Sequence, residues 1–248
     1  TVYNLITSND PSVQLESTTE LRKILTSGNS GTPTVSIVQS VIDAGFVPYL
    51  VKFLSYSSCP QLQFEASWAL TNVVSGSSSQ TQVVVESGAV PYFVQLLSSP
   101  NKEVSEQAAW ALGNIAGDSS TYRDIILQSA VIPPLLQLLM EASALSTLRV
   151  GTWALSNLCR GKPAADFSLV SPALPTLARL IYSTDDEVVT DACWALSYLS
   201  DGPSEKIQAV IDCGICRRIV ELLMHSNFAV QVPALRIVGN ISSGNDYQ

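Results

Sequence analysis

A short phrase with Trp-Ala-Leu at its centre recurs four times along this chain of 248 residues. Its tryptophans are Trp68, Trp110, Trp153 and Trp194, which lie 42, 43 and 41 residues apart, and Arg236 stands 42 residues beyond the last. A fixed period of about 40 residues is typical of a stacked solenoid rather than of a single globular core. The repeat therefore constrains the fold more than the length of the chain does.

Each full repeat has the same order of polar, glycine and proline positions. In the repeat from 77 to 118, the pattern predicts a first helix around 81–86, a second from Val90-Pro91 to about Leu97, and a third over 102–116 that ends at Gly117. Proline near the first turn and glycine just past the end are the usual marks of helix termini. No alternating pattern of useful length predicts a strand.

Three helices in 41 to 43 residues is the organisation of armadillo repeats. We therefore predict an all-α, right-handed superhelical solenoid of about six armadillo repeats with three helices each. The expected boundaries are 1–32 for a partial first repeat, then 33–76, 77–118, 119–161, 162–202 and 203–248, in a single domain. The first repeat has Thr19 and Lys23 in place of Trp and Asn, as an atypical terminal repeat would. A start at Thr1 rather than at Met favours a piece of a longer protein.

The chain is acidic and rich in apolar residues, with 21 acidic and 13 basic residues, a net charge of −8 and 46% hydrophobic residues. Because Lys and Arg clusters bind phosphate backbones, we expect no nucleic acid partner, and the negative charge favours basic partners instead. The five cysteines are odd in number and lie mostly within helical patterns, which favours a reducing compartment. The apolar run 83–97 is interrupted by polar residues and no leader opens the chain, so we expect a soluble intracellular protein without membrane contact.

Trp and Asn four residues apart lie on one side of a helix, so stacked third helices are expected to present them as a ladder. Neighbouring helices pack about 8–10 Å apart and an extended peptide rises about 3.3 Å per residue, so one repeat matches about three ligand residues. The amides of Asn72, Asn114 and Asn157 can donate to and accept from a peptide backbone. Slots between the indoles suit the stems of Lys and Arg, whose charged heads gain about 0.5–2 kcal/mol from the ring faces.

Polar residues near the tryptophans complete this predicted surface. Asp118 lies eight residues after the second tryptophan, and Gln107 lies three before it. Glu187 and Asp191 lie seven and three residues before the fourth tryptophan, on the same side of its helix. A competing interpretation places the tryptophans in the core and makes the asparagines caps of helix ends. The equal spacing favours the recognition surface.

Three segments resemble a known family. They read Ala-Leu-Gly-Asn-Ile-Ala-Gly-Asp at 111–118, Trp-Ala-Leu-Ser-Asn-Leu-Cys-Arg-Gly-Lys at 153–162 and Asp-Ala-Cys-Trp-Ala-Leu-Ser-Tyr-Leu-Ser-Asp-Gly-Pro at 191–203. They closely resemble importin-α (karyopherin-α), the armadillo adaptor that carries proteins bearing a nuclear localisation signal to importin-β. The resemblance implies an adaptor that shuttles between cytoplasm and nucleus and binds the Lys/Arg-rich signals of cargo proteins as extended peptides.

The resemblance also implies a major signal-binding groove across the second to fourth repeats. Carried over by position, its residues are Trp68, Asn72, Ser75, Gly76, Thr81, Gln107, Trp110, Asn114, Asp118, Trp153, Asn157, Asp191, Trp194 and Tyr198, with Arg236 and Asn240 beginning a minor groove. In the family, the aspartate at the Asp118 position pairs with the most critical lysine of the signal. Val150 departs from the family, which often has a polar residue there. The family's importin-β-binding segment precedes the repeats and is absent here, so we expect importin-β binding only through that absent segment.

Two other functions compete with this expectation. One is an armadillo scaffold that holds a constitutive basic partner unrelated to import, and such a scaffold would ignore most unrelated basic signals. The other is an enzyme that uses the thiols of Cys213 and Cys216. A zinc site needs a second pair of ligands, and only His225 lies nearby, so we expect no metal site, no cofactor and no catalysis.

Overall fold

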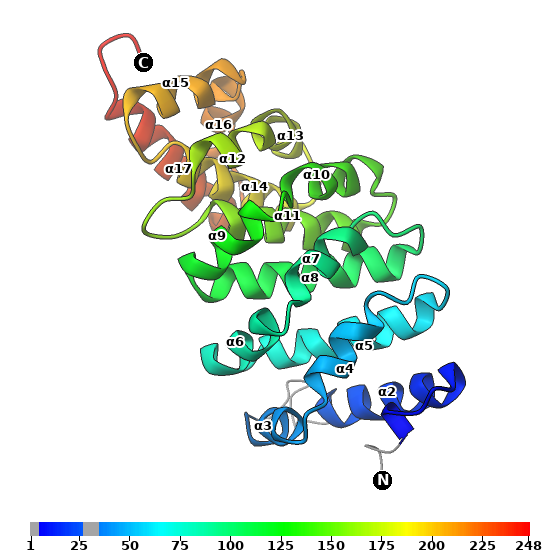
Figure 1. Cartoon of the computed structure of the whole chain (residues 1–248). Helices are drawn as coiled ribbons and strands as arrows, with labels where there is room; N and C mark the ends of the chain where they lie inside the picture. The colour runs from blue at the N-terminus through cyan, green and yellow to red at the C-terminus, as the bar shows by residue number, and fades with distance from the viewer. Residues whose placement is uncertain (1–4, 27–34) are drawn as a thin grey trace. The chain divides into compact units, whose positions relative to one another are not determined.

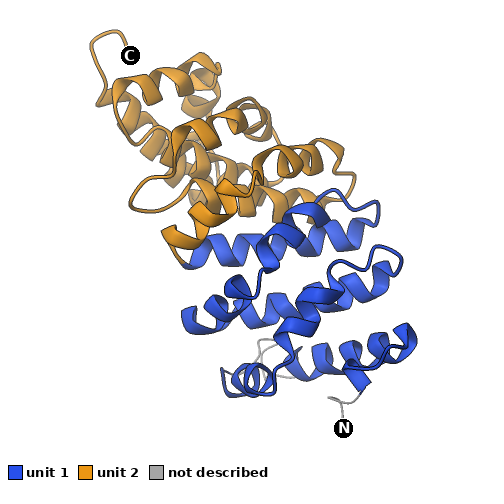
Figure 2. Ribbon diagram, in the orientation of Figure 1, with its two compact units in different colours: residues 1–118 blue, residues 119–248 orange. Residues whose placement is uncertain are grey.

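The computed structural model describes residues 5–26 and 35–248, where the chain forms α-helices and one short 3-10 helix (Figure 1). Within these ranges no residue lies in a strand, which confirms the all-α prediction. The chain divides into two units, residues 1–118 and residues 119–248, which have different colours in Figure 2. Each unit has its own stack of helices.

In unit 1 the longest helices lie side by side. The helices are α2 (Pro11–Thr26), α3 (Val35–Asp43), α4 (Val47–Phe53), α5 (Pro60–Val74), α6 (Ser78–Glu86), α7 (Ala89–Leu96) and α8 (Lys102–Asp118). α5 packs between α2 and α8, while α4 packs on α5 and α7 packs on α8. The long third helix of one repeat therefore contacts the third helix of the next.

Proline, serine and glycine set the helix ends of unit 1. Pro60 stands at the first position of α5, and Ser77 with Gln80 forms a capping box at the start of α6. Gly88 has a φ of 80°, a left-handed conformation that separates α6 from α7. The predicted end of α8 at Gly117 is wrong, since the helix runs on to Asp118. Gly117 is not among the glycines with positive φ, so it does not break the helix.

Unit 2 repeats the same arrangement. Its helices are α9 (Ser120–Gln128), α10 (Ile132–Glu141), α11 (Leu145–Cys159), α12 (Phe167–Val170), η1 (Ser171–Ala173), α13 (Leu174–Leu180), α14 (Asp186–Leu199), α15 (Ser204–Asp212), α16 (Cys216–Leu222) and α17 (Phe228–Ser242). α14 packs between α11 and α17, and α10, α13 and α16 each pack on the long helix that follows. The three long helices of this unit therefore form a row.

Each third helix buries one side and exposes the other, as α8 illustrates. Val104, Leu112 and Ile115 have at most 1% of their surface exposed. Burial of each such aliphatic side chain contributes about 1.5–3 kcal/mol to folding. Trp110 and Asn114 lie on the opposite side of the same helix, and neither is buried. The apolar side thus fixes the rotation of the helix and turns the polar and aromatic side outward.

Among the described helices, none by itself has the length and apolar character needed to cross a membrane, and only two pairs bent by 83°, α3 with α4 and α9 with α10, reach that measure together.

Candidate functional site

The predicted aromatic and amide side chains of unit 1 lie on α5 and α8. Trp68 and Asn72 on α5, and Trp110 and Asn114 on α8, are four residues apart in each helix and form the unit 1 ladder. Trp110 is 48% exposed, and the other three side chains are half-buried. None of the chain's four tryptophans is buried. The interpretation that they belong to the core is therefore wrong.

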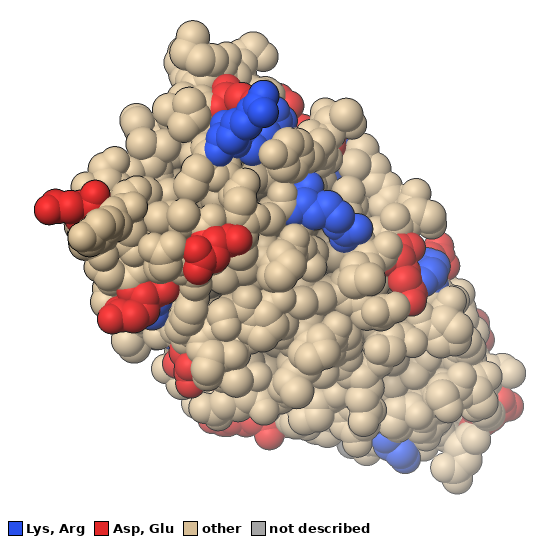
Figure 3. Space-filling model, turned by 90° about the horizontal axis from the view of Figure 1, so that it is seen from above, with Lys and Arg blue, Asp and Glu red and all other residues tan. Residues whose placement is uncertain are grey.

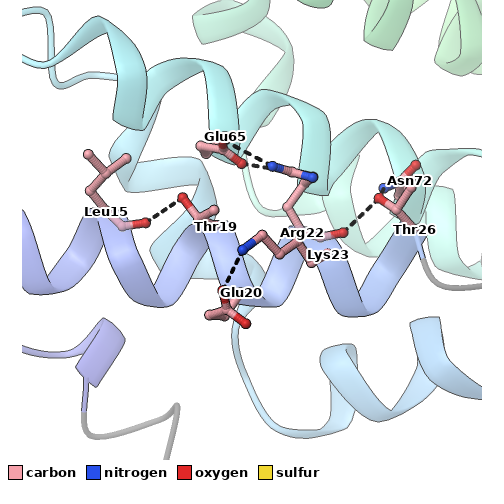
Figure 4. Close-up of polar contacts among 8 residues, drawn as sticks. All are labelled: Leu15, Thr19, Glu20, Arg22, Lys23, Thr26, Glu65 and Asn72. Atoms are coloured by element: carbon pink, nitrogen blue, oxygen red, sulfur yellow. Dashed lines mark hydrogen bonds and ion pairs between the residues drawn. The ribbon is translucent and has the colours of Figure 1, made fainter.

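The first rung of the unit 1 ladder, which is Trp68 with Asn72 on α5, contacts a cation of the chain itself. The guanidinium of Arg22, on α2, lies 4.4 Å from the centroid of the Trp68 ring. Arg22 also donates two hydrogen bonds to Glu65, at 2.7 and 3.2 Å, and Figure 4 shows this pair between α2 and α5. Asn72 donates from Nδ2 to Thr26 Oγ1 at 3.2 Å. α2 therefore engages both side chains of the first rung.

The second rung, which is Trp110 with Asn114 on α8, is not engaged by other side chains in this way. Among the described residues, Trp110 has no ring or cation partner, and the Asn114 side chain makes no hydrogen bond. Asp118 lies one turn beyond Asn114, and its Oδ1 accepts a hydrogen bond from the Ser78 hydroxyl at 2.8 Å. The other carboxylate oxygen, Oδ2, is buried and has no hydrogen-bond partner in the part of the chain that is described. One helix face thus carries an indole, an amide and a carboxylate one turn apart.

Three residues that follow α5 were expected to contact a ligand, and they differ in exposure. Ser75 and Gly76 are exposed, at the C-terminal end of the helix. Thr81 has 0% of its surface exposed, and its hydroxyl donates to the carbonyl of Val74 at 3.3 Å. Thr81 therefore holds the start of α6 against the end of α5, in place of the direct contact expected from the sequence.

Gln107 is also largely covered. It is 8% exposed, and its Nε2 donates to Thr71 Oγ1 at 2.9 Å. This bond joins α8 to α5 beneath the exposed rows. Gln107 thus braces the two helices, and burial leaves it little surface for a ligand.

The unit 2 ladder lies on α11, α14 and α17. It consists of Trp153, Asn157, Trp194, Tyr198, Arg236 and Asn240. The rings of Trp194 and Tyr198 are stacked, with centroids 5.9 Å apart and planes 23° apart. The guanidinium of Arg236 lies 5.9 Å from the first centroid and 5.2 Å from the second. A ligand cation at these two rings meets the chain's own arginine.

The asparagine of the last rung is used between helices. Asn240 donates from Nδ2 to the carbonyl of Ser197 at 2.9 Å and to Ser200 Oγ at 3.1 Å. This places its amide nitrogen on α14 rather than on a ligand. Asn157 on α11 is 8% exposed, so its amide is less accessible than the half-buried Asn114 of unit 1.

A cavity of about 370 Å³ opens beside Trp194 and Tyr198. Its lining comprises Cys159, Arg160, Gly161, Lys162, Ala164, Trp194, Tyr198, Asp201 and Arg236. Asp201 Oδ2 lies 3.2 Å from the Lys162 ammonium and 3.5 Å from Arg236. One carboxylate therefore faces two cations, which leaves the lining net positive.

The acidic residues near Trp194 have different environments. Burial, and then the charge of Glu187, raise the pKa of Asp191 to about 6. Glu187 is exposed and lies 3.2 Å from Arg149. Arg149 also binds Asp185 through both carboxylate oxygens, at 3.1 and 2.6 Å, and this pairing holds the pKa of the Asp185 carboxyl below its usual range. Arg149 therefore compensates the charges of Asp185 and Glu187 on one edge of α14.

The five cysteines are free thiols. Cys213, at the end of α15, donates from Sγ to the carbonyl of Ala209 at 3.3 Å. Burial and the neighbouring Asp212 raise its pKa, which disfavours the nucleophilic thiolate. Within the described ranges, no three His, Cys, Asp or Glu side chains gather as metal ligands would.

Three charged residues near the two ladders were not predicted from the sequence. Arg149 carries a usable signal, because it lies four residues before Trp153 on the same helix side. Asp201 lies three residues after Tyr198, which is a signal of the same kind, whereas Arg22 carries none, because the first repeat has no tryptophan near it.

Comparison with known proteins defines the class of this fold and site. The family described as armadillo/beta-catenin-like repeat matches residues 35–75, 77–117, 119–160, 166–201 and 203–243. The chain belongs to the armadillo repeat family.

Its relatives narrow the class further. Importin subunit alpha-1b of Oryza sativa subsp. japonica is 58% identical over 243 residues, which are 98% of this chain and 45% of the relative. Importin subunit alpha-4 of Arabidopsis thaliana is 57% identical over 234 residues, 94% of this chain and 43% of the relative. The chain is thus a homologue of importin-α subunits and spans about 45% of their length.

A solved structure shows the same fold. A designed armadillo repeat protein in complex with the peptide (KR)4 superposes with a TM-score of 0.83 and 26% identity, over 97% of this chain and 98% of that one.

Proposed function

We propose that this chain is the cargo-binding part of a nuclear import adaptor, and that its ladders bind Lys/Arg-rich nuclear localisation signals as extended peptides. The observation that carries the proposal is the second rung of unit 1. There an indole that is 48% exposed, an amide with no bond in the described structure, and a carboxylate with one unpaired oxygen follow one another on α8. The importin-α homologues and the designed protein that holds (KR)4 support the same ligand chemistry.

Each of these groups has a distinct part in binding. The face of Trp110 attracts a Lys or Arg head by about 0.5–2 kcal/mol, depending on how far the pair is desolvated. The Asn114 amide donates to and accepts from the peptide backbone, whatever the ligand sequence. The Asp118 carboxylate, one turn beyond Asn114 on α8, attracts a cationic head, and a hydrogen bond to a charged group contributes about 1.5–3 kcal/mol. Together they select an extended chain with basic side chains.

The charge of the whole chain favours the same ligands. With a net charge of −8, the protein attracts cationic peptides over distances longer than direct contact. Figure 3 shows a face that is mostly uncharged, with acidic and basic side chains in small separate groups.

The test is direct binding of a labelled Lys/Arg-rich peptide, measured by fluorescence anisotropy. The double variant Trp110→Ala, Asn114→Ala is expected to weaken binding by about 10- to 100-fold, because it removes both the ring face and the backbone clamp. Asp118→Lys is expected to abolish binding, because it places a cation where the ligand's cation binds. Tyr182→Ala, which removes an aromatic side chain that is 59% exposed outside the ladders, is the matched control.

Undiminished binding in both ladder variants would contradict the proposal. Several unrelated basic peptides are used in parallel, because a scaffold for one constitutive partner would bind only one of them. Within this proposal, an adaptor binds them all and carries their proteins between cytoplasm and nucleus.

A further inference from the structure

The two tryptophans of the unit 1 ladder differ in what stands over their rings. Trp110 leaves 48% of its surface exposed. Arg22 covers Trp68 at 4.4 Å from the ring centroid, and since Arg22 belongs to α2, the covered face is the one turned toward α2. Trp68 is the first tryptophan of the chain, so its α2 side is the end of the ladder.

Arg22 is held firmly in this place. Its side chain is 16% exposed, and it forms two hydrogen bonds to Glu65, whose side chain is 6% exposed. Bidentate pairs of this kind are geometrically specific, and breaking a buried pair leaves an uncompensated charge. A ligand cation therefore cannot displace Arg22 without leaving Glu65 unpaired.

The amide of the same rung is engaged from the same helix. Asn72 donates to Thr26 Oγ1 at 3.2 Å, one turn along α2 from Arg22 (Figure 4). Asn114, its equivalent on α8, makes no such bond within the described residues. Both the ring and the amide donor of the first rung are thus engaged by α2.

We propose that Arg22 is a specificity-determining residue that closes the ladder at Trp68 and so fixes how many consecutive basic side chains of a peptide find a ring. This rests on the proposed function, since it assumes that Lys and Arg side chains stack on the ladder. Arg22 reproduces the bound state of such a side chain, with a guanidinium on an indole face and a carboxylate behind it. It fills the terminal position from within the chain.

The test uses the whole chain and a series of peptides of constant length, in which one alanine after another is replaced by lysine. In the unchanged chain, the gain in affinity per added lysine falls away once the open ring faces are filled. In Arg22→Ala the gain continues for one further lysine, by about 2- to 30-fold, the range for a cation on an indole face. An isomer of each peptide with its last lysine set apart from the run corrects for long-range attraction.

Lys23→Ala is the matched control. It removes one positive charge from the neighbouring position of α2, where Lys23 is exposed and pairs with Glu20 at 2.7 Å. In Lys23→Ala, the gain in affinity per added lysine is expected to stop at the same lysine as in the unchanged chain.

Arg22→Ala leaves Glu65 buried without a partner, which can prevent folding. A second variant therefore removes both charges of the pair. Arg22→Gln with Glu65→Gln removes both charges and is expected to extend the series too, with a gain at the lower end of the range. Circular dichroism confirms that each variant is helical. If the gain in affinity per added lysine stops at the same lysine in the folded variants as in the unchanged chain, this inference alone is overturned. If the unchanged chain binds no peptide of the series, the proposed function fails, and the inference fails with it.

Discussion

Asp191 is a carboxyl group whose charge changes close to neutral pH. Burial, followed by the charge of Glu187, raises its pKa to about 6, while Arg149 is engaged by Glu187 and Asp185. An unfolded Asp titrates near ~4, so the native carboxyl keeps its proton to a higher pH. Its contribution to stability is therefore greatest below pH ~4 and falls as the pH rises to about 6.

The same shift predicts a pH dependence of binding. At pH ~5 only about a tenth of a carboxyl with this pKa is ionised, so a cationic peptide beside Asp191 loses most of its partner's charge. We expect the affinity for a Lys/Arg-rich peptide to fall severalfold between pH ~7 and pH ~5, and we expect Asp191→Asn to flatten this dependence. Anisotropy titrations across that range make the measurement.

His225→Gln is the control for this pH series, since His225 is the only histidine and lies 3.6 Å from Asp186. A profile that keeps its slope in Asp191→Asn but loses it in His225→Gln would assign the effect to the histidine.

Residue patterns predicted which positions face outward better than they predicted burial. Trp110 and Asn114 are accessible as expected, because their spacing alone places them opposite Leu112 and Ile115. Thr81 is fully buried, and the resemblance that pointed to it carries no information on packing.

At the scale of the helix, a residue with positive φ lies at the turn between the first two helices of several repeats; it is Gly45, Gly88 or Gly214 in three of them and Ala130 in another. Gly88 has a φ of 80°, and a Cβ added there would meet nothing within 4 Å, so only the backbone conformation resists substitution. We expect Gly88→Ala to lower the free energy of unfolding by about 1–2 kcal/mol. Chemical denaturation followed by circular dichroism measures the change.

Gly239 is the matched comparison for this glycine. It lies inside α17 without a positive φ, and a Cβ there also meets nothing within 4 Å. Gly239→Ala is expected to raise stability by about 0.5–1 kcal/mol, because alanine favours the helix. Equal effects of the two substitutions would contradict the role given to the Gly88 backbone.

The helices themselves were largely predictable, whereas their exact ends were not. The pattern of the repeat from 77 to 118 indicated three helices, and α6, α7 and α8 are present there. Gly117 was expected to stop α8 but keeps a helical conformation. A glycine ends a helix only when its surroundings favour the left-handed conformation, which a sequence does not specify.

At the scale of the whole molecule, the net charge of −8 makes salt a test of how peptides bind. We expect the affinity for a Lys/Arg-rich peptide to weaken steadily as salt rises from about 0.1 M, where the screening length is about 10 Å, to 1 M, where it is about 3 Å. A residual affinity is expected at high salt, because ring stacking and backbone hydrogen bonds do not depend on long-range charge.

Titrations at several salt concentrations measure this dependence, with the Trp110→Ala, Asn114→Ala variant beside the unchanged chain. The variant is expected to lose the residual part. An affinity that does not change with salt would contradict a role for the acidic charge in binding.

The polar links between equivalent helices have a consequence for how such a chain can change in length. Five hydrogen-bonded pairs join residues that lie between 36 and 46 positions apart in the sequence. The pairs are Arg22 with Glu65 (43 apart), Asn72 with Thr26 (46), Gln107 with Thr71 (36), Arg149 with Asp185 (36) and Asn240 with Ser197 (43). Each bond therefore reaches the adjoining repeat and goes no further. Duplication of one whole segment of about 42 residues, the spacing of the tryptophans, would leave the existing bonds in place and add one new junction, between the two copies. Lineages can lengthen or shorten a molecule of this kind without redesigning its interior.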